Sequence, residues 1–466
     1  MRQRRRVLTA LQLIACLLCL APRMAAAQNR IYRPNLADED WSFLKDPAKR
    51  IDWWDRVKYI PLGDRDDWYV TLSGEIRYRP EGSRIRPTDT APATRDQYLL
   101  QRYLFGSDLH FGTRTRVYVE MQSGVINGRI GSSRPTDANS IDLHQGFVEW
   151  KTDAGPAPAF DLRIGRQELN IGSSRLISAA PGLNVKRSFD GVRVATAAGG
   201  WRFDGAAAVL TDLEAGAFDD GPDGKIRFWG VAAGRTGIWL RGAWSFYYLG
   251  LENKNIQFAQ GRGEDVRNTI GVNWKGGAGI ADGNYDAIFQ VGSFKGHRAT
   301  AWGLSSETGF RLAKVPWRPR LGVRANGASG DRSPSDPTLQ SFNPLFPGAS
   351  FAGPIGLFGP TNMIDFTPFI SAMPKRNVVL GFEHPWYWRT STGDGIYNTA
   401  LQLLAPPTAG TGRSIGASSG ILAVWQVTRH FSASGAIIRL HSGPFLERTF
   451  VRGGAGLYSI TAAYRF

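Results

Sequence analysis

Cysteine is nearly absent from this chain of 466 residues, which contains only Cys16 and Cys19. Both lie in an N-terminal segment that starts with basic residues and continues as an apolar run too short to span a bilayer comfortably. This pattern predicts a signal peptide, residues 1–27, cleaved before Gln28. The alternative is a lipoprotein lipidated at Cys16, although the apolar run continues where a lipoprotein would turn polar. The exported chain then has no thiol, which excludes disulfides, zinc–thiolate sites and cysteine catalysis.

Long apolar runs are also missing. No segment after the signal peptide holds twenty consecutive apolar residues, which excludes helical membrane spans. The six histidines are scattered without metal-ligand or general-base spacing, and no serine has the sequence context of a nucleophile. Asp331 and Asp336 lack the oxygen spacing of a strong calcium site and are predicted to stabilise a turn instead. We therefore predict no catalytic residue, no metal site and no cofactor.

Acidic residues are fewer than basic ones, 40 against 56, so that the formal charge is +16. Cleavage of the signal peptide removes five arginines and no acid, which lowers this charge to +11. A basic excess raises the local concentration of anions. In an exported protein this indicates acidic polymers, lipopolysaccharide or anionic solutes as partners, and no nucleic acid.

The chain is rich in segments that alternate polar and apolar side chains with a period of two, as strands do. Near the C-terminus Tyr458 and Ile460 share one side, and in an earlier segment Arg77 and Arg79 share the side opposite Ile76. An outward orientation of such arginines would place guanidinium groups in hydrocarbon at a cost of several kcal/mol. The arginine-bearing side is therefore predicted to face water inside a barrel.

The alternating segments predict an all-β fold, a transmembrane antiparallel β-barrel of about 18 strands over residues 67–466. A periplasmic N-terminal lead-in at 28–66, with a short helix near 37–43, precedes it. The apolar segment 331–363 is predicted either to pack into the mouth or lumen, where it could gate, or to form a lid over the outer rim. The strands are expected near 68–79, 98–111, 114–125, 141–151, 159–167, 187–196, 201–211, 226–235, 237–249, 265–275, 283–294, 300–313, 317–329, 364–372, 376–388, 415–428, 430–440 and 455–466.

The connections between these strands alternate between short and long. Short turns on one rim and long loops on the other are typical of outer-membrane barrels, in which the turns face the periplasm. The long loops are expected at 80–97, 126–140, 168–186, 212–225, 250–264, 330–363, 389–414 and 441–454.

Two long motifs carry a family resemblance. Residues 165–194 read GRQELNIGSSRLISAAPGLNVKRSFDGVRV, and residues 329–347 read SGDRSPSDPTLQSFNPLFP. Together they resemble the alginate export family of outer-membrane barrels, and the lead-in motif EDWSFLKDPAKR is similar to that family as well. The resemblance implies an eighteen-stranded monomeric pore with an arginine-rich constriction that conducts a polyuronate. It also implies gating by an inward-folded loop and a periplasmic loop.

Guanidinium groups are always charged and can hold a carboxylate with two donors, and rings of arginine are a common basis of anion selectivity. We therefore predict a substrate-binding set of nine arginines, together with three acids that hold them in place. Each member could instead be an ion pair of the lumen wall that contacts no cargo. The predicted arginines are Arg77, Arg102, Arg116, Arg163, Arg166, Arg193, Arg241, Arg267 and Arg324, and the supporting acids are Glu168, Asp190 and Glu307.

The predicted function is an anion-selective channel in the bacterial outer membrane for an alginate-like polyuronate. A porin for small anionic solutes such as carboxylates, a barrel enzyme and a plugged adhesin or structural barrel are the alternatives. The expected partners are the anionic cargo, outer-membrane lipid and lipopolysaccharide, and periplasmic export components.

Overall fold

The structure is a computed structural model that describes residues 32–65, 67–85, 94–131, 133–152, 159–237, 241–348, 358–407, 412–449 and 454–466. The predicted signal peptide lies outside the described residues. The helices in the described ranges are short, and none has the length and apolar character needed to cross a membrane.

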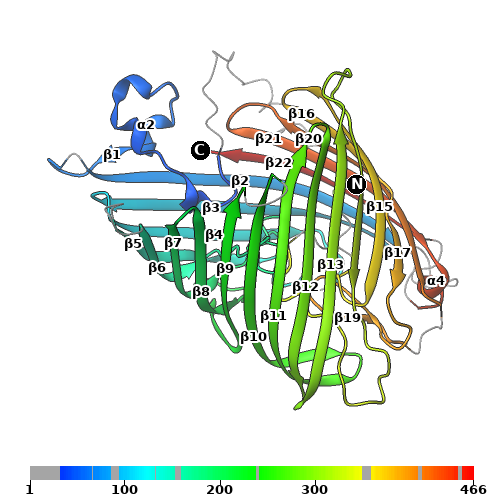
Figure 1. Cartoon of the computed structure of the whole chain (residues 1–466). Helices are drawn as coiled ribbons and strands as arrows, with labels where there is room; N and C mark the ends of the chain where they lie inside the picture. Colours follow the sequence, from blue (N-terminus) through cyan, green and yellow to red (C-terminus); the bar gives the residue numbers. More distant parts are fainter. Residues whose placement is uncertain are drawn as a thin grey trace.

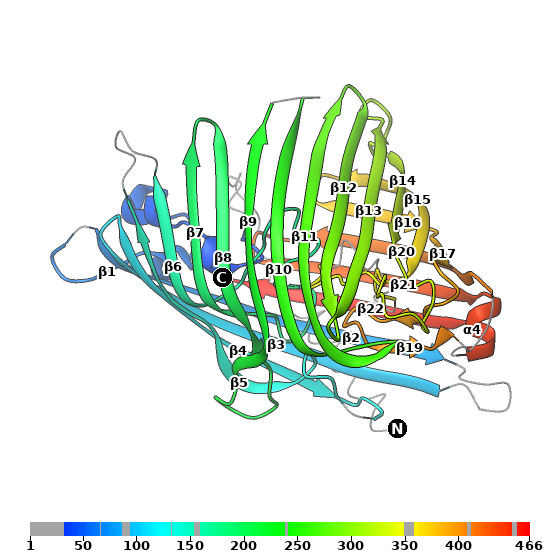
Figure 2. The same cartoon turned by 60° about the horizontal axis from the view of Figure 1, so that its bottom comes forward.

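The chain forms a closed antiparallel β-barrel of 18 strands, as predicted (Figure 1). The first barrel strand, β2, pairs with the last, β22, and this pairing closes the sheet. In Figure 2 these two strands lie behind the front wall of β9–β13. β16 and β17 together make one interrupted strand, because both pair with β15 on one side and β20 on the other. The strands are β2 (Trp68–Ile85), β3 (Thr94–Phe111), β4 (Thr115–Asn127), β5 (Asn139–Lys151), β6 (Phe160–Gln167), β7 (Phe189–Ala198), β8 (Trp201–Asp212), β9 (Gly221–Thr236), β10 (Gly242–Phe258), β11 (Gly261–Ala278), β12 (Ala281–Phe294), β13 (His297–Arg311), β14 (Arg320–Ala328), β15 (Met363–Lys375), β16 (Val378–Glu383), β17 (Trp386–Arg389), β20 (Ser414–Gln426), β21 (Phe431–Ser442) and β22 (Ala455–Arg465).

The two rims differ in their connections, as expected. One rim has short links such as Gly199–Gly200, where both glycines adopt positive φ, and the other carries most of the long connections. The prediction of a long loop at 250–264 is wrong, because β10 and β11 run on to a tight turn in which Phe258 pairs with Gly261. Polar side chains occupy both sides of the strands at 252–255 and 262–265, so that the sequence there loses the alternation that marks a strand between lipid and lumen.

The alternation itself is confirmed by burial. On β11 the side chains of Asp265, Arg267 and Thr269 are fully buried, whereas Ile270 is 62% exposed. The exposed apolar residues of neighbouring strands, such as Phe289, lie on the same outer side. The outer side therefore presents apolar residues, as a lipid-facing surface requires, and the polar residues face inward.

The seam between β2 and β22, which closes the barrel, includes an aromatic contact between the lead-in and the last residue of the chain. The backbone groups of Phe466 exchange hydrogen bonds with those of Gly74. The ring of Phe466 lies where a side chain at position 74 would project, because a Cβ atom there would come within 2.5 Å of it. Trp54 stacks on Phe466 from the other side, with ring centroids 4.1 Å apart. The glycine in β2 therefore makes room for the terminal aromatic ring.

The lead-in folds as a series of tight turns rather than as the predicted helix near 37–43. Asn35 and Asp40 each accept a hydrogen bond from the backbone two residues on, so that each starts a new turn and the helix does not propagate. The lead-in consists of the 3-10 turns η1 (Leu36–Asp38), η2 (Ser42–Lys45) and η3 (Pro47–Lys49), the helical turn α2 (Asp55–Lys58) and the short strand β1 (Ile60–Pro61), which pairs with β2.

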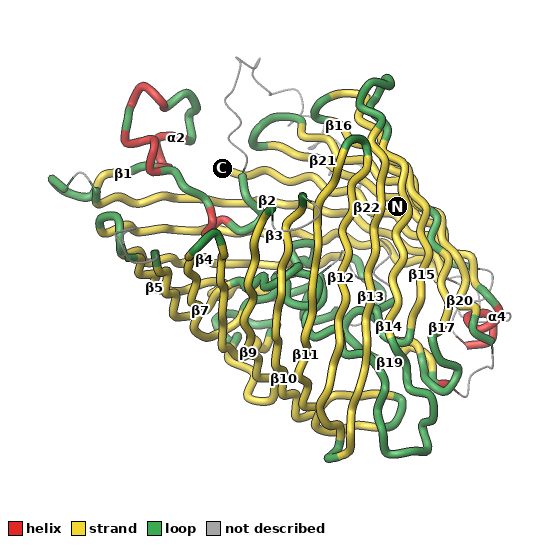
Figure 3. Tube along the Cα trace, in the orientation of Figure 1, coloured by secondary structure: helices red, strands yellow, loops and turns green. Residues whose placement is uncertain are grey.

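Two long loops fold into the barrel and form its main apolar core. Ile177 of the β6–β7 loop and Phe342 and Phe346 of the β14–β15 loop pack on inward-facing residues of β7 to β14. The two loops are joined by a hydrogen bond from Ser178 N to Phe346 O of 3.1 Å. Figure 3 shows loop segments behind β9–β11. The stretch from Phe342 to Phe346 thus packs inside the barrel, whereas residues 332–337 are mostly exposed and Phe351 lies outside the described residues.

A second apolar cluster closes the long-loop rim. It joins the helical turn α4 (Pro444–Thr449) to the hairpin of β18 (Ile396–Tyr397) and β19 (Leu403–Ala405). Asp331 is buried nearby, where its backbone N–H donates to Asp394. Asp336 accepts a hydrogen bond from Thr338 N at 2.8 Å within its own turn.

Candidate functional site

Seven of the nine predicted arginines lie on the inward side of the barrel wall. Their position follows from the alternation of each strand: Arg163, for example, precedes Ile164, whose side chain is 52% exposed on the outer side. The seven inward-facing arginines are Arg77, Arg102, Arg116, Arg163, Arg193, Arg267 and Arg324.

The other two arginines do not join this wall. Arg166 and its partner Asp190 share the outward side of β6 and β7 with Ile164, and the Arg166 Nε atom donates to Asp190 at 2.8 Å. Arg241 lies outside the strands, in the β9–β10 turn, where it is exposed and has a φ of 46°. The predicted strand 237–249 begins only at Gly242, so that the alternation did not apply to Arg241.

On β2 and β3 the inward arginines hold the β6–β7 loop. Arg102 donates through Nε to Glu75 at 2.7 Å and through Nη1 to the carbonyl oxygens of Pro181 and Leu183 at 2.9 and 2.8 Å. Arg77 donates through Nη2 to the same Leu183 oxygen at 2.7 Å. Both arginines are nearly fully buried. Their N–H groups are thus directed at loop carbonyls, and these two residues anchor the inward-folded loop to the wall.

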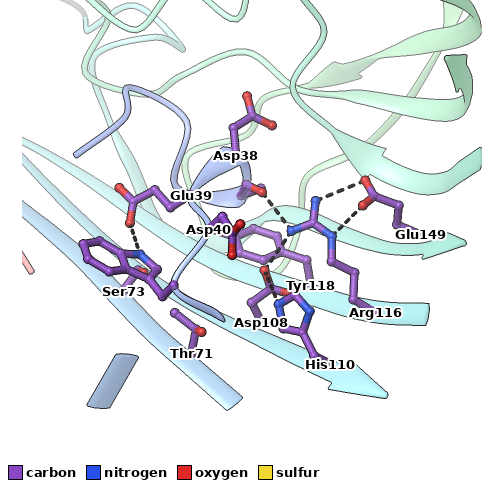
Figure 4. Close-up of polar contacts among 12 residues, drawn as sticks. Asp38, Glu39, Asp40, Thr71, Ser73, Asp108, His110, Arg116, Tyr118 and Glu149 are labelled. Atoms are coloured by element: carbon purple, nitrogen blue, oxygen red, sulfur yellow. Dashed lines mark hydrogen bonds and ion pairs between the residues drawn. The ribbon is translucent and has the colours of Figure 1, made fainter. Parts of the chain in front are cut away.

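At the short-turn rim Arg116 joins the lead-in to the wall (Figure 4). Its guanidinium group donates to Asp108 at 2.8 Å, to Glu149 at 2.7 Å and to the carbonyl oxygen of Ala37 at 2.9 Å. Arg163 shares the Glu149 carboxylate at 2.8 Å. The lead-in is therefore docked against the inner wall of the barrel through its main chain.

A buried lysine provides a second anchor for the lead-in. Lys58 donates to Ser73 Oγ at 2.6 Å, lies 3.6 Å from Glu39 and stands 4.9 Å above the ring of Trp41. Burial lowers the pKa of Lys58 to about 8, although the nearby Glu39 opposes the shift. Burial likewise raises the pKa of Glu39. The ammonium and carboxylate groups are thus held in a poorly hydrated site.

On the opposite wall, Glu307 holds two arginines of β14. It accepts from Arg320 Nη2 at 2.9 Å and from Arg324 Nε at 3.2 Å, and Arg324 Nη1 lies 3.6 Å from Glu383. On β11 Arg267 is fully buried and donates to Asp265 at 2.7 Å and to the carbonyl oxygen of Ser341 at 3.2 Å. Arg267 therefore anchors the β14–β15 loop, as Arg77 and Arg102 anchor the β6–β7 loop.

Arg193 and Arg324 have the most accessible side chains of the seven inward-facing arginines. Their side chains are 20% and 23% exposed, and Arg193 donates to Asp204 through Nε at 2.9 Å. Arg193 also lines a cavity of 670 Å³ at the short-turn rim, together with Arg116 and Arg163. At Arg193 and Arg324 the guanidinium group is thus held by an acid and is still accessible from the lumen.

The three predicted supporting acids have different partners. Glu307 holds two arginines and Asp190 one, as described above. Glu168 instead pairs with Lys186 and lies 3.0 Å from His144, so that it joins the two ends of the β6–β7 loop.

The prediction missed several charged residues of the lumen wall. Glu75, Glu149 and Asp204 were detectable, because each occupies an inward position in its strand, and each forms an ion pair with an inward arginine. Arg187 gave no such signal: it donates to the carbonyl oxygen of Ser178 at 2.8 Å inside a loop whose path the alternation does not predict.

Comparison with known proteins places the barrel among outer-membrane channels. The family model for alginate export matches residues 68–451. A search of curated proteins finds no match.

Solved structures with the same fold include three porins. OccK11 (OpdR) of Pseudomonas aeruginosa is 12% identical with a TM-score of 0.54, and the match covers 87% of this chain and 98% of that one. A BenF-like porin of Pseudomonas fluorescens Pf-5 is 9% identical with a TM-score of 0.57 over 85% and 98% of the two chains. OpdK of Pseudomonas aeruginosa, solved with vanillate, is 9% identical with a TM-score of 0.53 and the same coverage.

Proposed function

Because the chain belongs to the alginate export family of outer-membrane barrels, we propose that it is an anion-selective channel that passes an acidic polysaccharide, an alginate-like polyuronate, through an arginine-lined lumen. The observation that carries this proposal is the inward position of seven arginines on a wall whose outer side is apolar. A polyuronate bears one carboxylate on each sugar, which the guanidinium groups that remain accessible from the lumen can bind.

Two of these arginines are best suited to contact cargo. Arg193 donates hydrogen bonds to Asp204 through Nε and Nη2. Its Nη1 atom makes no hydrogen bond within the described part of the chain. Arg324 is held by Glu307 and remains partly exposed. An acid partner competes with an incoming carboxylate for each guanidinium group, which keeps the binding weak enough for release, as conduction requires.

A second candidate function is a porin for small carboxylates. The shared fold with OpdK, which was solved with vanillate, favours this alternative. The two functions differ in how affinity depends on cargo length: a polymer contacts several arginines at once, whereas a small solute contacts one or two.

The test is the current through the purified channel in a planar bilayer, with uronate oligomers of increasing length added from the monomer upward. The proposal expects an anion-preferring current that longer oligomers block at lower concentrations. Arg324→Ala should weaken this block, whereas the matched variant Arg241→Ala, which removes the same charge from the exposed β9–β10 turn, should leave it unchanged.

Two outcomes would contradict the polymer proposal. Equal block by the monomer and the oligomers would favour the small-carboxylate porin. A cation-preferring current, or an Arg324→Ala variant that oligomers block like the wild type, would remove the arginine-lined lumen as the basis of selectivity.

A further inference from the structure

The barrel wall has a gap in its strand pairing beside β5. β6 is only 8 residues long and pairs with β5 from Gly146 onward, so that the first residues of β5 have no partner in β6. The β8–β9 link at 213–220 covers this edge instead. Ser140 N donates to the carbonyl oxygen of Gly216 at 3.0 Å, and Phe218 N donates to that of Ile141 at 3.0 Å.

Three carboxylates converge where this link meets β5. Asp142 of β5 is buried, and Asp219 and Asp220 lie at the end of the link, the former exposed to solvent. One oxygen from each lies within 4.8 Å of the others. Two oxygens bound to the same calcium ion at 2.3–2.6 Å can be up to about 5 Å apart, so that the three carboxylates are close enough to share one ion.

The guanidinium group of Arg166 forms no ion pair with this cluster. Arg166 forms its ion pair with Asp190 at 2.8 Å, and it reaches Asp220 only through the backbone carbonyl oxygen, at 3.4 Å. The backbone N–H groups of Asp219 and Asp220 approach Asp142 only at 3.4 Å, which is long for a hydrogen bond. The two carboxylates of the link accept backbone hydrogen bonds, Asp220 from Glu214 N at 2.7 Å and Asp219 from Gly216 N at 3.1 Å, but none of the three carboxylates forms an ion pair with a basic side chain of the described residues.

A buried amide points independently to a ligand. Asn139 is 1% exposed, and its amide faces the cluster, because Nδ2 donates to Asp220 at 2.9 Å. Its Oδ1 atom is buried and has no hydrogen-bond partner among the described residues. Such orphaned oxygens are rare in native proteins. Rotation of the amide would exchange its two ends and turn this oxygen toward Asp220 as a fourth oxygen ligand.

We propose that Asp142, Asp219, Asp220 and Asn139 form a calcium site that ties the β8–β9 link to β5. All four donors are oxygens, which suits a hard cation and disfavours zinc or copper. Calcium accepts the irregular geometry of a strand residue combined with a loop, whereas magnesium requires a near-ideal octahedron. Solvent completes the coordination on the exposed side of Asp219. The ion would hold together the part of the wall that β6 leaves unpaired.

Calorimetric titration of the full chain tests this proposal. The protein is refolded from inclusion bodies, so that it carries no lipopolysaccharide-bound ions, then treated with EGTA and titrated with calcium chloride in detergent. We expect one saturable calcium ion per chain and at least tenfold weaker binding of magnesium. Asp219→Asn, at an exposed position, should weaken calcium binding at least tenfold, and Asp220→Asn should do the same. The matched control is Asp223→Asn, two residues into β9, which should bind like the wild type.

The slower electrophoretic migration of heated samples, which reports a folded barrel, checks that each variant is intact. The proposal is overturned by a wild-type protein without saturable calcium uptake. It is equally overturned by folded Asp219→Asn and Asp220→Asn variants that bind calcium as tightly as Asp223→Asn. Neither result depends on what passes through the lumen.

Discussion

Removal of the Arg193 guanidinium group should shift the ion selectivity of the channel. The size of this shift can be worked out from the charges of Arg193 and its partner Asp204. Arg193 and Asp204 face the lumen from neighbouring strands, with side chains 20% and 17% exposed. Arg193→Ala removes one positive charge and leaves the Asp204 carboxylate without a partner. Asp204→Ala changes the local charge by the same amount with the opposite sign, and the double variant leaves the net charge of the lumen unchanged.

The size of the shift follows from Coulomb's law. For an ion passing about 8 Å from the lost charge, the interaction in water is about 0.5 kcal/mol. An anion loses this energy and a cation gains it, so that the two differ by about 1 kcal/mol before screening. At 0.01 M salt, with a Debye length of about 30 Å, the anion-to-cation permeability ratio should fall about fourfold. At 0.15 M salt, with a Debye length of about 8 Å, it should fall only about twofold.

The assay is the reversal potential under a salt gradient in a planar bilayer, measured at both salt concentrations. Arg193→Ala should lower the permeability ratio, Asp204→Ala should raise it, and the double variant should resemble the wild type. The reasoning is refuted if both single variants match the wild type at low salt. It is also refuted if the double variant shifts as far as Arg193→Ala, since the effect would then come from altered shape and not from charge.

Three further predictions concern stability and pH. Arg267→Met leaves the buried Asp265 carboxylate without its cationic partner, with only the Asn343 amide among the described residues donating to it, and should destabilise the barrel by about 3–5 kcal/mol in urea unfolding in lipid vesicles; an unchanged midpoint would contradict this. The pKa of Lys58 is about 8 in the folded state and about 10.4 in the unfolded state. Between pH 8 and about pH 10.4 the unfolded lead-in therefore binds more protons than the folded one, and the stability of the folded lead-in rises with pH. Hydrogen-exchange protection of the lead-in should therefore increase from pH 8 to 10, and Lys58→Met should abolish this increase. Burial, together with the nearby Asp142 carboxylate, raises the pKa of Asp220 to about 6. Calcium affinity in the titration should therefore fall by up to about tenfold per pH unit below pH 6. A calcium affinity that does not change between pH 7 and pH 5 would exclude Asp220 as a ligand.

The strand count and the inward position of most arginines could be predicted because both follow from a period of two. Residues such as Arg163 and Ile164 alternate between water and lipid, and this contrast is local in sequence. The same rule places Arg166 on the outer side, so that its prediction as a lumen residue disagreed with the alternation. The rule gives no answer for Arg241, which lies in a turn.

The partners of the inward residues could not be predicted in the same way. Arg77 and Arg102 bind carbonyl oxygens at 181–183, which lie 79 to 106 positions away, and only the path of the β6–β7 loop brings these groups together. Glu168 and Lys186 meet for the same reason. The converging aspartates at 142, 219 and 220 likewise come from two distant segments, so that no spacing within either segment indicates an ion site.

The pairing of each accessible guanidinium group with an acid affects how a long chain could move through the lumen. Under the proposed function, a sugar that leaves Arg193 or Arg324 is replaced at the guanidinium group by Asp204 or Glu307, which already lies beside it. The departure of one sugar is thus compensated at once, and the arrival of the next displaces an equivalent contact. The free energy of a polymer that exchanges near-equal contacts in this way changes little as it moves along the lumen. A modest concentration gradient is then enough to drive it.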